Sequence, residues 1–178
     1  MALAVCLLFD RRSEQAVRSL WDRVEQAGVP SLRSHTHGRH VPHVSYAVLR
    51  RWDEDAVSAA LGSLKGGAPV ELQFDGLGLF RRGRTWLVAG VSADFVARQQ
   101  RVVDAVTATG ADLHKHDVPG TWLPHCSLAP RATLAQRFVD RVRKLNLEIG
   151  IPEKIASLRG SDIPAIARAA MVEANAAE

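Results

Sequence analysis

The same four-residue frame occurs twice in this chain of 178 residues, each time at the start of an apolar segment. Residues 42–45 read Pro-His-Val-Ser and residues 124–127 read Pro-His-Cys-Ser, 82 positions apart. Side chains alternate faces along a strand, so each histidine shares a face with the serine two residues later. The doubling predicts two similar lobes, each of which presents an imidazole beside a hydroxyl.

Apolar periodicity predicts a similar order of elements around each frame, which is typical of an α+β fold. Ser13 is the expected N-cap of the first helix, and residues 31–42 are expected to form a polar loop. Residues 81–83 have the composition of a tight hairpin turn. Strands are expected at 2–9, 43–49, 69–80, 84–91 and the second frame, and helices at 13–27, 53–64, 94–109 and 132–145.

Composition restricts the classes of partner. The formal charge of +4 and pI near 9.6 are compatible with an anionic partner such as RNA or a phosphate ester, and equally with an ordinary basic protein. No apolar run approaches the roughly 18 residues of a membrane span, and the segment at 2–9 is interpreted as a buried strand and not as a signal peptide. Two cysteines form no disulfide framework, so a cytoplasmic location is expected.

Two imidazole–hydroxyl pairs suit the cleavage of a phosphodiester. One histidine, neutral, would take a proton from water or a ribose hydroxyl, and the other, charged, would protonate the leaving oxygen. His43 and His125 are therefore candidate catalytic residues, and Ser45 and Ser127 are candidate ligands of the phosphate oxygens. No cofactor is needed. If the two lobes face each other, the imidazoles flank one cleft, and a non-catalytic RNA- or nucleotide-binding module that uses this cleft is the alternative.

Other histidines cluster before the first frame, where positions 35, 37, 40 and 43 are all histidine. Such clusters can bind zinc, but a structural site normally needs four ligands with cysteine or carboxylate support, and no CxxC or HExxH pattern occurs. We therefore expect no metal. Arg39 and His40 are candidate substrate contacts.

Aromatic residues near the frames have two possible roles. Trp122 is the candidate for stacking on a base, because it lies close to His125; Trp86 and Phe80 are weaker candidates. Core packing is the commoner role of such side chains. Cys126 is expected to be a packed thiol, and the absence of a Gly-x-Ser-x-Gly turn argues against a serine hydrolase.

The two frames resemble the paired His-x-Ser/Thr motifs of the two-histidine (2H) phosphoesterase superfamily, the 2′-5′ RNA ligase and RNA 2′,3′-cyclic phosphodiesterase group. Each motif in that family is followed by an apolar residue, as Tyr46 and Leu128 follow here. The resemblance covers residues 2–132 and includes the segments 77–80 and 85–88, which look like the family's hairpin.

This resemblance implies a bilobal, pseudo-twofold fold with antiparallel sheets lining a central cleft and helices outside. It implies metal-independent hydrolysis or transesterification of 2′,3′-cyclic or 2′-5′ phosphodiester bonds in RNA ends or nucleotides. It carries catalytic roles onto His43 and His125 and phosphate binding onto Ser45 and Ser127.

The C-terminal part departs from the family pattern, and we expect a two-lobed domain over 1–135 followed by an extension over 136–178. In place of another strand, the tail resembles the C-terminal helical segment of iron-dependent alcohol dehydrogenases, with Gly-Ile-Pro at 150–152 and Asp-Ile-Pro at 162–164. It contains no cluster of metal ligands, so it implies no dehydrogenase activity. Two short helices are expected, at 152–159 and 163–175.

Overall fold

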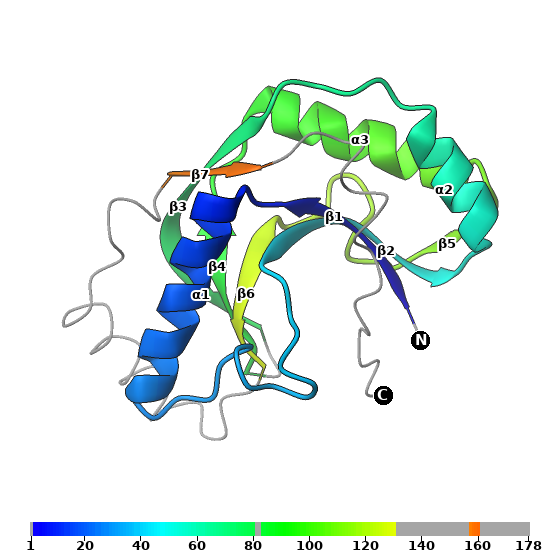
Figure 1. The fold of residues 1–178 in the computed structure, drawn as a ribbon. Helices are drawn as coiled ribbons and strands as arrows, with labels where there is room; N and C mark the ends of the chain where they lie inside the picture. The colour runs from blue at the N-terminus through cyan, green and yellow to red at the C-terminus, as the bar shows by residue number, and fades with distance from the viewer. Residues whose placement is uncertain (1, 81–82, 131–156, 161–178) are drawn as a thin grey trace.

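The computed structural model describes residues 2–80, 83–130 and 157–160. These residues form two antiparallel sheets, of strand order β1-β2-β5 and β6-β4-β3-β7, and three helices that lie against them (Figure 1). The predicted α+β class is confirmed. In chain order the elements are β1 (Leu3–Leu8), α1 (Arg11–Gln26), β2 (His43–Arg51), α2 (Glu54–Gly62), β3 (Val70–Leu79), β4 (Thr85–Ala89), α3 (Ala93–Thr107), β5 (Asp112–Leu113), β6 (His125–Ala129) and β7 (Ser157–Gly160).

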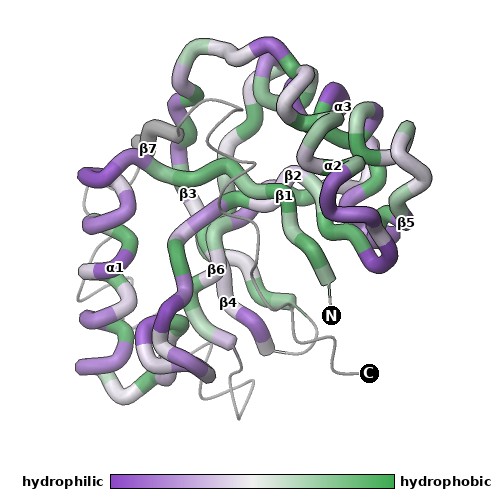
Figure 2. The backbone as a smooth tube through the Cα atoms, turned by 45° about the vertical axis from the view of Figure 1, so that its right-hand side comes forward, coloured by the Kyte–Doolittle hydropathy of each residue, from purple (hydrophilic) through white to green (hydrophobic). Residues whose placement is uncertain are grey.

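Helix α1 begins earlier than the sequence pattern predicted. Its N-cap is Asp10, whose carboxylate accepts a hydrogen bond from the Ser13 backbone N–H at 2.7 Å, so the expected N-cap role of Ser13 is wrong. Both residue types can cap a helix, and the one three positions upstream reaches the orphan N–H groups of the first turn. Polar and apolar residues alternate along the helix (Figure 2), and its apolar face, with Val17 and Trp21, is buried.

The two lobes are interleaved along the chain. Helix α1 follows β1 but lies beside the four-stranded sheet, where the Trp21 indole N–H donates to the Ser127 carbonyl at 3.2 Å. Helix α3 follows β4 but covers the β1-β2-β5 sheet, where the Gln99 side chain donates to the Tyr46 carbonyl at 3.2 Å (Figure 1). Each lobe therefore depends on a helix that follows a strand of the other lobe.

Strand β7 corrects the end of the helix expected at 152–159, because residues 157–159 belong to this strand; residues 152–156 lie outside the described part of the chain. Residues 157–160 pair antiparallel with Val70–Gln73 of β3, whereas β4 pairs with β3 only from Phe74 onward. Without β7, the backbone groups of Val70–Gln73 would lack strand partners. Pairing with β3 therefore overrides the local helix preference of residues 157–159. The helices expected at 132–145 and 163–175 lie outside the described residues, and the domain boundary at 135 stays a prediction.

Short strand β5 was not predicted, because two residues carry no periodicity; it pairs with Leu49 and Arg51 of β2.

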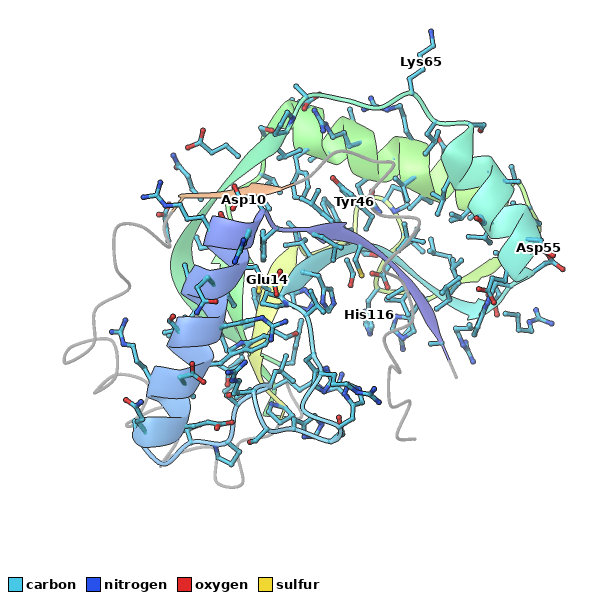
Figure 3. All side chains as sticks on the ribbon, viewed as in Figure 1. Asp10, Glu14, Tyr46, Asp55, Lys65 and His116 are labelled. Atoms are coloured by element: carbon cyan, nitrogen blue, oxygen red, sulfur yellow. The ribbon has the colours of Figure 1, made fainter. Side chains whose placement is uncertain are left out.

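The core is one cluster of buried apolar side chains from both sheets and all three described helices. Tyr46, fully buried, lies between β2 and α3 (Figure 3) and packs on Phe95 with ring centroids 5.4 Å apart. In the part of the chain that the structure describes, we find no helix long and apolar enough to span a bilayer.

Candidate active site

The two Pro-His-x-Ser frames enter β2 and β6 with the predicted alternation. His43 and Ser45 are partly exposed, whereas Val44 between them is fully buried. His125 and Ser127 are partly exposed, and Cys126 is fully buried, as expected for a packed thiol. Each strand thus presents its histidine and serine away from the core.

Both imidazoles make the same hydrogen bond. The Nδ1 of His43 lies 2.7 Å from the Val41 carbonyl oxygen, and the Nδ1 of His125 lies 2.8 Å from the Leu123 carbonyl oxygen. A carbonyl only accepts, so Nδ1 carries the proton in both rings and Nε2 is left to exchange protons with a substrate. The intervening proline keeps the residue before it extended, which turns its carbonyl toward the ring.

Both serine carbonyls are bound by tryptophan indoles. The Trp122 N–H donates to the Ser45 carbonyl at 2.8 Å, and the Trp21 N–H donates to the Ser127 carbonyl at 3.2 Å. The frames therefore share two backbone contacts, one at the histidine and one at the serine. This repetition gives the site the approximate twofold symmetry that the doubled motif predicted.

The neighbouring strands break this symmetry. Strand β1 places Cys6 opposite Ser45, with 3.7 Å between Sγ and Oγ. Burial lowers the pKa of His43, but attraction to the negative charge of Cys6 in its thiolate form, a hydrogen bond with that side chain and the Val41 carbonyl together outweigh burial and raise the pKa of His43 to about 9. His43 therefore favours the imidazolium form near neutral pH.

His125 has aromatic neighbours instead. Its ring centroid lies 5.0 Å from that of Phe80 and 5.4 Å from that of Trp86, both in edge-to-face arrangements. Burial lowers the pKa of His125 from its ordinary value, the Leu123 carbonyl opposes this, and the charges of His43 and Arg84 lower it further. His125 therefore favours the neutral form.

Electrostatic and packing contacts place the two frames together. The charge of His43 acts on His125, and β2 and β6 are in direct contact. Burial raises the pKa of the Cys126 thiol to about 12, and a backbone hydrogen bond from His43 opposes the rise, so the thiol reaches the start of β2. Two imidazoles with opposite charge preferences therefore lie near one another.

The other predicted contacts lie around the first frame. The Nε2 of His40 and the Thr36 hydroxyl form a hydrogen bond of 2.9 Å, and the His40 ring stacks on His37 with centroids 4.6 Å apart. Burial lowers the pKa of His40, and the charges of His37, His35 and His43 add to the effect, which places His40 within range of His43. Arg39 is exposed, and its backbone N–H donates to His37.

Trp122 lies on the side of β2 that faces α3. Its indole packs against Phe95 and Tyr46, with centroids 5.2 and 6.1 Å away, in addition to binding the Ser45 carbonyl. These contacts give the Trp122 ring a packing role. Base stacking by Trp122 stays a prediction. Among residues 2–80, 83–130 and 157–160, no group of three or more histidine, cysteine or carboxylate side chains is arranged to hold a metal ion.

A family model described as the 2′-5′ RNA ligase superfamily matches residues 13–149, well over half of the chain. The chain belongs to this superfamily. Membership makes it a phosphoesterase of the two-histidine type, as the paired frames predicted. No curated protein sequence matches it significantly.

Two solved structures of Usb1 from Kluyveromyces marxianus are similar to this superfamily member. The structure with uridine monophosphate has 16% sequence identity and a TM-score of 0.41, and the other has 17% identity and the same TM-score. In both cases the similarity covers 87% of this chain and 81% of the Usb1 chain.

The sequence did not predict three features of the candidate active site. The contacts of Cys6 with Ser45 and of Trp21 with Ser127 carry no local signal, because the partners are 39 and 106 positions apart along the chain. Phe80 and Trp86 were considered for base stacking and for core packing, but not as neighbours of His125. The one local signal was Gly78, since a glycine inside a strand often marks a close approach of another group.

Proposed function

We propose that this protein is a metal-independent phosphodiesterase that opens 2′,3′-cyclic or 2′-5′ phosphodiester bonds in RNA ends or nucleotides. The observation that carries the proposal is the matched pair of Nδ1–H hydrogen bonds to the Val41 and Leu123 carbonyls. They leave Nε2 of His43 and of His125 as the two proton-exchanging atoms of one site.

The opposite charge preferences assign the two roles in hydrolysis. His125, neutral, takes a proton from water as the water oxygen bonds to phosphorus. His43, charged, gives its proton to the ribose oxygen as the bond from phosphorus to that oxygen breaks. One water is consumed, and proton exchange with solvent then restores both rings. The hydroxyls of Ser45 and Ser127 donate to the non-bridging oxygens, where negative charge is held.

The site's surroundings supply the proposed recognition. Arg39 and His40 lie on the loop that leads into β2, so they are proposed to contact the nucleotide or RNA next to the phosphate. A basic chain with a formal charge of +4 favours such anionic substrates. A cytoplasmic location, where RNA ends are available, is part of the same proposal.

The test is turnover of 2′,3′-cyclic nucleotides and of 2′-5′-linked dinucleotides in the presence of EDTA. His43→Ala and His125→Ala should each lower kcat by about 10²–10⁴-fold. His116→Ala is the matched control, because this exposed histidine contacts His114 and neither frame. Activity that survives both substitutions, or that requires added zinc, would overturn the proposal. Binding without turnover across the panel would identify the alternative, a non-catalytic binding module.

A further inference from the structure

The aromatic neighbours of His125 come from one hairpin. Strand β4 pairs with β6 so that Trp86 lies opposite Ser127 and Val88 lies opposite His125. Phe80 follows β3 and stacks on Trp86, with centroids 4.9 Å apart and an interplanar angle of 30°. The two rings together contact His125 edge-to-face. None of the ring contacts among the described residues involves His43.

Gly78 makes room for this arrangement. It lies opposite Trp86 in the β3–β4 ladder, and a Cβ at residue 78 would overlap the six-membered ring of the indole. The indole therefore lies flat on the glycine backbone and occupies the space of the missing side chain. Gly76, on the same strand, differs, because a Cβ there would meet Val88 only at an ordinary 3.6 Å.

No hydrogen bond explains why residue 86 is tryptophan. Its side chain is 7% exposed, yet its indole nitrogen has no partner among the described residues. A buried donor without a partner is unfavourable, so packing holds this ring. The partners of that packing are Gly78 below, Phe80 on one face and His125 at the edge.

We propose that Trp86, which lies on Gly78, and Phe80, which stacks on Trp86, form a positioning platform for the imidazole of His125. The rings exclude water from the imidazole and limit its rotation, while the Leu123 carbonyl fixes Nδ1. The platform keeps His125 neutral and its Nε2 directed at the attacking water. Two positive groups act on it, His43 from β2 and Arg84 from the residue just before β4, and both also favour the neutral ring. The inference rests on the proposed function, in which His125 is the base.

The first measurement is an NMR titration of the His125 ring protons in the full chain, assigned with His125→Ala. Trp86→Leu and Phe80→Leu should each raise the pKa of His125 toward 6.5, because water gains access to the charged form. Trp86→Phe keeps a ring and should leave most of the shift in place. Phe80 is only partly buried, so Phe80→Leu gives a folded variant even if Trp86→Leu does not.

The second measurement is the pH profile of kcat/KM on the substrate that the wild type turns over. Trp86→Leu should move the acidic limb to higher pH and lower kcat by about 10- to 100-fold, the scale of a small misplacement of a reacting group. Trp86→Phe should restore most of this loss. Introduced into the wild-type protein, Gly78→Ala should lower kcat as Trp86→Leu does. Introduced into the Trp86→Leu variant, Gly78→Ala should lower kcat no further, because the added methyl group acts by displacing the indole. Gly76→Ala is the matched control and should change neither quantity.

An unchanged His125 titration in both leucine variants would overturn the platform. Equal effects of Gly78→Ala with and without Trp86 would also overturn it, since the glycine would then serve only the strand. The titration needs no turnover, so it decides on the platform even if no substrate in the panel is cleaved. Loss of activity in His43→Ala and His125→Ala with no titration shift would overturn the platform alone.

Discussion

One substitution, tryptophan to phenylalanine, should have different costs at three positions of this protein. Trp21→Phe and Trp122→Phe each remove an indole N–H that binds a serine carbonyl, at 3.2 and 2.8 Å. Trp86→Phe removes a buried N–H that has no partner among the described residues. The change in ring size is the same in all three, so the difference between them isolates the hydrogen bond.

The magnitude follows from the contacts. Losing one hydrogen bond costs about 0.5–1.5 kcal/mol net, and leaving the acceptor buried and unpaired raises this to about 1–3 kcal/mol. Trp21 is 1% exposed, so Trp21→Phe should reach the upper part of this range, whereas Trp122 is partly exposed and water can reach its acceptor. Trp86→Phe should cost less than either, because loss of the unpaired donor offsets the loss of packing.

The assay is equilibrium unfolding in urea followed by far-ultraviolet circular dichroism, since tryptophan fluorescence changes with the substitution itself. The midpoint should fall for Trp21→Phe and Trp122→Phe at an unchanged m-value, and it should fall least for Trp86→Phe. In thermal unfolding, each kcal/mol corresponds to about 2–4 °C in Tm for a chain of this size. A Trp86→Phe variant as destabilised as Trp21→Phe would refute the reasoning.

Three further expectations follow from the described contacts. The profile of kcat/KM against pH should be bell-shaped, with an acidic limb below pH 6.5 from His125 and a basic limb at about pH 9 from His43, and a basic limb near 6.5 would contradict the assigned roles. Asp10→Ala removes the N-cap of α1 and should lower the urea-unfolding free energy by about 1 kcal/mol. Glu25→Gln should destabilise the protein most at pH 7 and progressively less as the pH falls below 4.5, as judged from urea midpoints. A hydrogen bond from the Ser34 side chain, the largest of several contacts at 31–34, lowers the pKa of Glu25 from 4.5. The contribution of the Glu25 carboxylate to stability is therefore present above pH 4.5 and is lost as the pH falls through the pKa of Glu25 in the folded protein.

Apolar periodicity along the chain predicted much of the local structure. The expected strands at 43–49, 69–80 and 84–91 and the expected helices at 53–64 and 94–109 agree with β2, β3, β4, α2 and α3 to within a few residues. The prediction of which side chains turn outward in the two frames is also confirmed. Local patterns failed at the start of α1, where two capping residues compete, and at 157–160, where β3 supplies a partner strand.

The sequence by itself determined that two histidines and two serines would stand on the outer faces of two strands, because side-chain direction repeats every two residues within one segment. Only the tertiary structure decided what surrounds them. Cys6 beside Ser45 and Trp21 against Ser127 join residues 39 and 106 positions apart, and nothing in the periodicity of either segment specifies its partner. The two frames are alike because their local sequence is alike. Their protonation preferences differ because the neighbouring strands bring a thiol to one imidazole and aromatic rings to the other.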